Sequence, residues 1–186
     1  MNIPIAWQDK LKPARFMDSH QLELHPGPEH LDLRYLEEFL RSTQSSGFPL
    51  PVRALFGLRH VLGQLFGWDD SQVDSRPESS SYFWRMTELE RHQCFIEPGQ
   101  RSGPARRLWN DETSAVFEVN NATCQAFAVV ELHGKLASLS VFVIETKWWS
   151  KYYLALIEPF RKYLVYPLSA RWLNSKWKWA HQQQAN

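Results

Sequence analysis

The sequence lacks the residue clusters that hold metals or carry out dithiol chemistry. Its 186 residues include only two cysteines, Cys94 and Cys124, and neither has a CxxC partner or a histidine at ligand spacing. These absences exclude the common zinc and redox motifs, so we expect no metal site and no cofactor. A single buried disulfide is the alternative to two free thiols on strands, which is the state expected in a reducing cytosol.

The chain also lacks an excess of one charge and a long apolar run. Twenty-one basic residues against 20 acidic ones give a net charge of +1, so nucleic acid is not an expected partner. No transmembrane segment is expected, because Glu158, Arg161 and Lys162 interrupt the C-terminal apolar pattern. The N-terminus has no apolar segment after a basic start, so we expect no signal peptide and a cytoplasmic location. The oligomeric state stays open.

Motifs for nucleophilic catalysis are missing as well. There is no GxSxG sequence and no recognised cysteine neighbourhood. Two carboxylates on expected strands, Glu118 and Glu131, are the remaining acid–base candidates, and Glu118 is the better one. Burial on a concave sheet face would raise the pKa of either group and suit it to proton transfer. The alternative is that both lie on a solvated face or pair with Arg85 or Arg106.

What is present indicates one globular domain. Apolar residues make up 44% and charged residues 22% of the chain, which is ordinary for a soluble domain. A chain of this length removes roughly 70% of its unfolded surface from water. We expect an extended lead-in over residues 1–17, a single domain over residues 18–180 and a polar tail over residues 181–186.

The first half of the domain predicts a strand and two helices. Residues 20–25 alternate in polarity and form the expected strand. Asp32 is placed to cap a helix with apolar residues along one side. A second, mostly buried helix is expected between Pro51 and Gly67, followed by a polar loop over residues 71–81.

From residue 82 onward, apolar residues recur at every second position, which is typical of strands. Turn-forming pairs such as Asn110-Asp111 separate the candidate strands, which favours an antiparallel meander. These strands span residues 82–87, 92–97, 105–109, 113–119, 123–132 and 136–146. A helical pattern then runs from Trp148 almost to the end, and Pro159 and Pro167 are expected to bend it.

This order of elements predicts an α+β fold in which a long helix covers a curved meander and a cavity lies between them. Three stretches carry a family resemblance: residues 62–69 (LGQLFGWD), residues 153–161 (YLALIEPFR) continuing to Tyr166-Pro167, and Asn121-Ala122-Thr123 followed by Ala126-Phe127.

These stretches resemble an uncharacterised bacterial domain of unknown function, family 2867, near the START-like (SRPBCC) helix-grip superfamily. The resemblance covers about residues 20 to 178. It implies a curved antiparallel sheet wrapped around a long C-terminal helix, with two shorter helices after the first strand. It implies no active site.

Aromatic residues are the strongest compositional feature, with nine Trp, eleven Phe and six Tyr. In a helix-grip fold they can line a ligand cavity, or they can fill a core. The residues expected to bind a ligand are Phe117, Phe127, Phe142, Phe160, Leu164, Trp84 and Trp109, with Arg85 or Glu118 as a polar anchor.

Three hypotheses follow. The first is a non-catalytic binding domain for a small apolar ligand, such as a lipid or polyketide-like compound, held between the sheet and the C-terminal helix. The second is a hydrolase, cyclase or isomerase that uses a buried carboxylate such as Glu118. The third is a peripheral membrane or protein-interaction module, because rings and cations interleave at residues 148–153 and 172–179. The alternative for this segment is a helix docked through its tryptophans.

Overall fold

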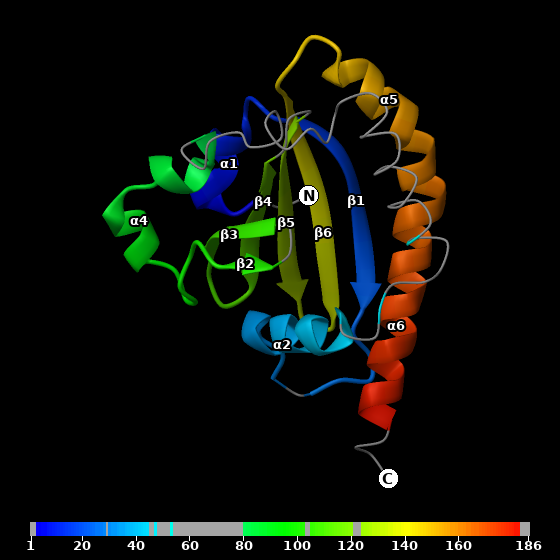
Figure 1. The fold of residues 1–186 in the computed structure, drawn as a ribbon. Helices are drawn as coiled ribbons and strands as arrows, with labels where there is room; N and C mark the ends of the chain where they lie inside the picture. Colours follow the sequence, from blue (N-terminus) through cyan, green and yellow to red (C-terminus); the bar gives the residue numbers. More distant parts are fainter. Residues whose placement is uncertain are drawn as a thin grey trace.

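The computed structural model describes residues 3–28, 30–44, 47, 53, 80–102, 105–120 and 124–182. Their centre is a six-stranded antiparallel sheet in the order β1-β6-β5-β4-β3-β2 (Figure 1). The strands are β1 (Arg15–Glu23), β2 (Arg101–Ser102), β3 (Ala105–Asn110), β4 (Ser114–Asn120), β5 (Cys124–His133) and β6 (Leu136–Glu145). The helices are α1 (Ile5–Leu11), α2 (Leu33–Gln44), the 3-10 helix η2 (Tyr82–Arg85), α4 (Glu88–His92), α5 (Ser150–Phe160), the π-helical η3 (Arg161–Val165) and α6 (Tyr166–Gln182).

The α+β class and the antiparallel meander are confirmed. Strands β3 to β6 follow one another in sequence and in the sheet, and each agrees with its predicted span to within a residue or two. The first strand begins at Arg15, five residues before its predicted start, and pairs with β6 at the edge of the sheet. Consecutive strands joined by short turns therefore form the meander that the turn pairs predicted.

The strands predicted over residues 82–87 and 92–97 are wrong. Residues 82–85 form η2 and residues 88–92 form α4. The side chain of Thr87 accepts a hydrogen bond from the Glu90 backbone N–H (3.3 Å), and the Glu90 carboxylate accepts one from the Thr87 backbone N–H (2.8 Å). This reciprocal capping box starts α4 in the gap between the two predicted strands, and α4 reaches the second of them at His92.

The N-terminal segment, expected to be extended up to residue 17, contains α1. Trp7 and Leu11 lie one helical turn apart on α1, and both are buried. At the other end, α6 continues to Gln182 and buries His181, which the sequence placed in a polar tail. Both ends of the described chain thus take part in the packed structure.

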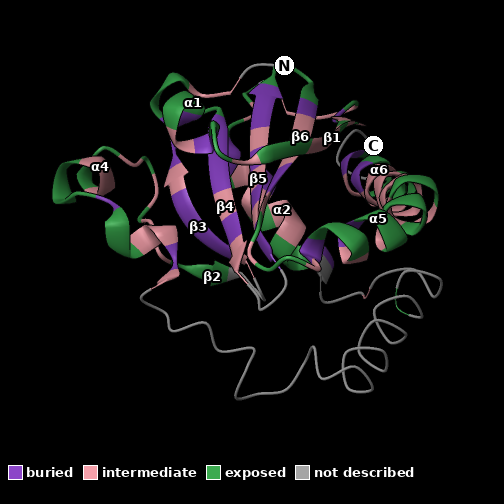
Figure 2. Cartoon of the chain, turned by 90° about the horizontal axis from the view of Figure 1, so that it is seen from above, coloured by how far each residue is buried: buried purple, intermediate pink, exposed green. Residues whose placement is uncertain are grey.

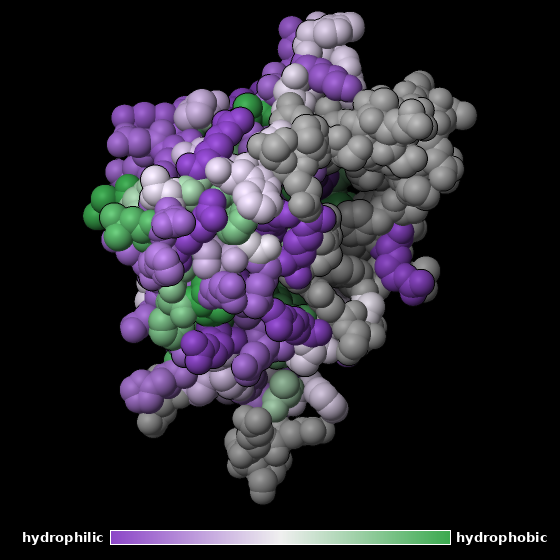
Figure 3. Space-filling view, turned by 60° about the vertical axis from the view of Figure 1, so that its left-hand side comes forward, coloured by the Kyte–Doolittle hydropathy of each residue, from purple (hydrophilic) through white to green (hydrophobic). Residues whose placement is uncertain are grey.

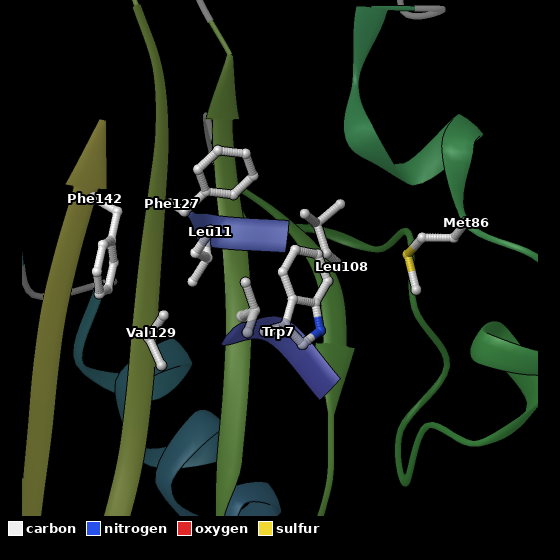
Figure 4. Close-up of a cluster of buried hydrophobic side chains, with 8 residues drawn as sticks. Trp7, Leu11, Met86, Leu108, Phe127, Val129 and Phe142 are labelled. Atoms are coloured by element: carbon white, nitrogen blue, oxygen red, sulfur yellow. The ribbon is translucent and has the colours of Figure 1, made fainter. Parts of the chain in front are cut away.

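Both faces of the sheet are covered (Figure 2). Alternation along β5 sends Phe127 and Val129 to one face and Ala128 and Val130 to the other. On the first face the strands pack against α1 and the segment around Met86 (Figure 4). This cluster comprises Trp7, Leu11, Met86, Leu108, Val116, Phe127, Val129 and Phe142. On the second face, α2 and α6 pack against the sheet through a cluster of Leu24, Leu33, Leu36, Ala115, Leu132, Ala137 and Trp177.

Trp177 fastens α6 to the chain that follows β1. Its ring is fully buried, and its Nε1 donates a hydrogen bond to the Pro26 carbonyl oxygen (2.6 Å). The ring stacks on His181 with centroids 4.2 Å apart, and the Nε2 of His181 lies 2.8 Å from the Tyr35 hydroxyl of α2. A Cβ at Gly27 would lie 3.1 Å from the Trp177 ring, so glycine lets the chain pass close to the indole.

The predicted C-terminal helix is interrupted rather than smoothly bent. Pro159 lies at the end of α5 and Pro167 is the second residue of α6, with the wider π-helical turn of η3 between them. Proline removes a backbone donor and clashes with the preceding turn, which accounts for the change of hydrogen-bonding pattern here.

Several predictions lie outside the described residues. They are the helix between Pro51 and Gly67, the stretch at residues 62–69, nearly all of the loop at residues 71–81, and residues 121–123. Neither Cys94 nor Cys124 forms a disulfide; Cys124 begins β5 as predicted, whereas Cys94 follows α4 rather than lying on a strand.

Candidate functional site

A cavity of about 360 Å³ lies on the second face of the sheet, beneath α2 and α6. Its apolar walls come from both layers and include Leu36, Leu40, Phe117, Val130, Leu139 and Leu173. Small side chains leave the space open, since Ala105, Ala128 and Ala137 of the sheet and Ala170 of α6 also line it. Because protein interiors are otherwise close-packed, a void of this size between two packed layers is a feature to be explained.

One end of the cavity carries a buried ion pair. Arg107 of β3 places its Nη2 3.0 Å from the Glu37 carboxylate of α2, and its side chain is only 4% exposed. Among the described residues, the Nε and Nη1 of Arg107 and the Oε1 of Glu37 have no hydrogen-bond partner. Two buried nitrogens of this guanidinium therefore have no acceptor among the described residues.

Two further arginines line the same end. Arg41 of α2 and Arg107 each donate to the Oε1 of Gln100 at 3.4 Å, and Arg101 of β2 also lines the cavity. Burial raises the pKa of Glu37, while the charges of Arg107 and Arg41 act in the opposite direction. We refer to Arg41, Arg101 and Arg107, with Glu37 and Gln100, as the arginine end.

The opposite end is built from β1 and α6. The ring of His20 faces that of Tyr166 with centroids 4.1 Å apart, and both residues line the cavity. Behind them, the Asp18 carboxylate lies 3.0 Å from the Arg161 guanidinium. Burial, with the Asp18 charge adding to it, raises the pKa of Tyr166 to about 12, so its phenol is neutral at physiological pH. We refer to His20 and Tyr166 as the tyrosine end.

The two ends lie at opposite sides of the sheet. Strand β1 is separated from β3 by three intervening strands, which at the usual spacing corresponds to about 19 Å. The cavity thus has apolar walls along the sheet and a different set of polar groups at each end.

Of the residues predicted to bind a ligand, Phe117 lines the cavity. The others lie elsewhere in the described structure. Phe127 and Phe142 belong to the cluster on the first face (Figure 4). Trp109 packs against that cluster. Trp84 and Arg85 are exposed on η2, Phe160 is half exposed at the end of α5, and Leu164 is half-buried in η3.

Glu118 lies on the face opposite Phe117 and away from the cavity. Its buried carboxylate accepts hydrogen bonds from the Ser81 hydroxyl, from the Tyr82 backbone N–H (3.0 Å) and from Gln125 Nε2 (2.5 Å). These bonds hold the start of η2 against the sheet. Glu131 is also buried, and its pKa is raised by that burial. The acid–base role of Glu118 stays a prediction, since its carboxylate already serves three donors.

The polar residues of the cavity were not among the predicted site residues. Glu37 and Arg41 lie one turn apart on the helix predicted after Asp32, next to the apolar Leu36 and Leu40. That spacing is the one feature of the sequence that could have indicated a polar pair at the edge of the apolar helix face. His20 lies in the predicted first strand. Nothing in the sequence links either pair to Arg107 or Tyr166, which come from distant segments.

A family model matches residues 11–168, and it is described as a protein of unknown function (DUF2867). The chain belongs to this family. The resemblance inferred from the sequence is therefore confirmed at the level of the DUF2867 family. The matched span contains both polar ends of the cavity, while Ser169, Ala170 and Leu173 lie beyond it. No curated protein and no solved structure matches the chain.

Two further observations concern the described residues only. No helix in this part of the chain is long and apolar enough to cross a membrane. No group of three or more His, Cys, Asp or Glu side chains within the same residues is arranged to hold a metal ion.

Proposed function

We propose that this chain is a binding domain for a small apolar ligand, such as a lipid or a polyketide-like compound, held between the sheet and α6. The observation that carries this proposal is the cavity of about 360 Å³. Its volume falls within the range of about 300–1,000 Å³ that is usual for small-molecule sites. A few polar groups at the ends of an otherwise apolar pocket are the usual means of orienting a ligand.

We also propose that the fold is a variant of the helix-grip architecture. An antiparallel meander and a C-terminal helix that together line a cavity support this assignment. Helix α1 and the segment around Met86, on the other face of the sheet, are then additions to that architecture.

Titration of the full chain with decan-1-ol by calorimetry tests the ligand-binding proposal. Wild type is expected to bind the alcohol, and Ala170→Phe, which fills the cavity from α6, is expected to weaken binding by about tenfold or more. Ala155→Phe is the matched control, because Ala155 is exposed on α5 and does not line the cavity.

Ala128→Leu fills the cavity from the sheet and replaces Ala170→Phe if that variant does not fold. Thermal unfolding establishes that each variant is folded. Absence of decan-1-ol binding to wild type, or equal binding by folded cavity-filling variants, would contradict the proposal.

A second candidate function rests on an exposed row of apolar side chains along α5. Tyr152, Leu156 and Phe160 recur every four residues and so share one helix face, and the ring of Trp148 lies 6.5 Å from that of Tyr152. These four side chains, the aromatic row, are between 50% and 81% exposed. By contrast, the face of the molecule in Figure 3 is largely hydrophilic, with hydrophobic residues in small separate groups.

The charges beside the aromatic row favour an anionic bilayer surface as its partner. Lys147, Lys151 and Lys162 are exposed around it, against one acidic residue, Glu158. Aromatic rings at headgroup depth with cations beside them are typical of interfacial helices. Of the later tryptophans, Trp177 is not available to a membrane, because it is buried in the contact between α6 and α2.

Co-sedimentation with vesicles tests this second function. Wild type is expected to sediment with vesicles of phosphatidylcholine and phosphatidylserine more than with phosphatidylcholine alone. Replacing Trp148 and Tyr152 by serine is expected to abolish that difference. Trp179→Ser is the matched control, since Trp179 is exposed on α6 and outside the aromatic row. Equal sedimentation of wild type and the double variant would contradict membrane binding through this surface.

A further inference from the structure

We propose that the ligand of the cavity is an anionic amphiphile, whose carboxylate or phosphate head group binds at the arginine end while its apolar tail lies along the sheet toward the tyrosine end. This inference rests on the proposed ligand-binding function. It adds the charge and the orientation of the ligand.

The hydrogen bonding of Arg107 supports an anionic head group at this end. Its guanidinium is almost fully buried, lines the cavity and leaves Nε and Nη1 without an acceptor among the described residues. Unpaired buried donors, charged ones above all, are costly and uncommon in native structures. The planar fork of donors on arginine matches the two oxygens of a carboxylate or phosphate, which an uncharged alcohol cannot reproduce.

The two ends of the cavity differ in charge. At the arginine end, Arg41 and Arg107 stand against one carboxylate, Glu37, so these three side chains carry a net charge of +1 when Glu37 is ionised. At the tyrosine end, Tyr166 is neutral and the Asp18–Arg161 pair behind it balances itself. Among these described carboxylate and guanidinium groups, the net positive charge lies at the arginine end, and this difference orients the ligand.

Glu37 is an internal counterion of Arg107. Its carboxylate lies 3.0 Å from the Nη2 of Arg107, on the guanidinium that the head group would contact. An incoming anion must share Arg107 with this carboxylate or displace it. Removing the charge of Glu37 should therefore strengthen anion binding, which a purely structural ion pair would not predict.

Calorimetric titration of the full chain with decane-1-sulfonate and decan-1-ol tests the inference. The sulfonate keeps its charge at all working pH values, and both probes are used below their aggregation concentrations. Wild type is expected to bind the sulfonate at least about tenfold more tightly than the alcohol. Glu37→Gln is expected to raise sulfonate affinity several-fold, and Arg41→Gln to lower it several-fold, with little change in alcohol binding.

Arg41 is exposed, so Arg41→Gln is expected to fold normally. Arg171→Gln is the matched control, because Arg171 is exposed on α6 and does not line the cavity; it should leave both affinities unchanged. Decanoate and decyl phosphate, compared in the same titration, identify which anion the arginine end prefers. A preference for either one over decan-1-ol supports the inference.

The failure of this inference differs from the failure of the proposed function. If decan-1-ol binds as tightly as the sulfonate and Arg41→Gln changes neither, the inference is overturned and the apolar cavity site stands. If neither probe binds wild type, the proposed function itself fails. If the sulfonate binds but Arg41→Gln and Glu37→Gln leave its affinity unchanged, the anion lies elsewhere and the inference is overturned.

Discussion

Trp177 connects α6 to α2 and to the chain after β1 through one buried ring and one hydrogen bond to Pro26. Trp177→Ala removes both and leaves a large cavity, so the free energy of unfolding should fall by about 3–5 kcal/mol. Trp179→Ala, two residues away on an exposed position, should change it by less than about 0.5 kcal/mol. Urea denaturation of the three proteins makes the comparison. Similar small losses for both variants would contradict the anchoring role of Trp177.

Glu118 accepts three hydrogen bonds on the face opposite the cavity. Glu118→Ala leaves these buried donors without an acceptor, so we expect a loss of about 3 kcal/mol in the free energy of unfolding. Decan-1-ol binding by the folded variant should be unchanged, because Glu118 does not line the cavity. Glu23→Ala, at an exposed position on β1, is the control for stability. Loss of ligand binding at full stability would instead support a direct role for Glu118.

Glu37 gives stability a defined pH dependence. Because burial raises its pKa, Glu37 ionises more readily in the unfolded chain than in the folded one. The stability it contributes is complete below the unfolded pKa, about 4.3, and is lost as pH rises through the higher folded value. Glu37→Gln cannot ionise and lacks this slope.

The unfolding free energy of Glu37→Gln minus that of wild type should therefore increase as pH rises from about 4.3, and then level off. Urea denaturation of both proteins across this range measures the difference. The other carboxylates, including Glu131, are common to both proteins and cancel in the subtraction. A difference that falls with rising pH would mean that the ion pair with Arg107 outweighs the burial of Glu37.

At the scale of elements, α2 begins where its capping residue predicted. The Oδ1 of Asp32 accepts a hydrogen bond from the Tyr35 backbone N–H at 2.8 Å. Asp32→Ala should lower the free energy of unfolding by about 1 kcal/mol, and Asp32→Asn, which keeps an acceptor, should lower it by much less. Thermal or urea denaturation of both variants checks this. Equal losses of unfolding free energy in the two variants would show that the hydrogen bond to the Tyr35 N–H does not stabilise α2.

The elements that the sequence predicted best are the longer strands bounded by turn pairs. Strands β3 to β6 each run for six residues or more between such pairs, and each was found near its predicted bounds. Short elements failed. In α4, five residues are fixed by the capping box of Thr87 and Glu90, and in α1 seven residues bury only Trp7 and Leu11. Over so few residues, the spacing of apolar side chains does not distinguish a strand, with its period of 2, from a helix, with its period of 3.6.

At the scale of the whole molecule, the sequence left undecided which face of the sheet lines the cavity. Strand β5 is apolar on both faces, since Phe127 packs on the α1 side and Val130 on the side of α2 and α6. Phe127 and Phe142 were predicted to line the cavity, but they lie on the opposite face of the sheet. The cavity lies on the face that carries His20, which the prediction left out together with Tyr166. The cavity draws on β1, α2, β3 and α6, and these segments are brought together by strand pairing and by the packing of both helices on the sheet.

The central claim is that the space between the sheet and α6 holds a small apolar ligand. Amide NMR spectra of the isotope-labelled chain, recorded with and without decan-1-ol, test it most directly because they locate the bound molecule. We predict that the largest shifts occur at cavity-lining residues, including Ala128, Val130 and Leu139 of the sheet and Ala170 and Leu173 of α6. Shifts confined to the aromatic row of α5, or no saturable shifts at all, would contradict the claim.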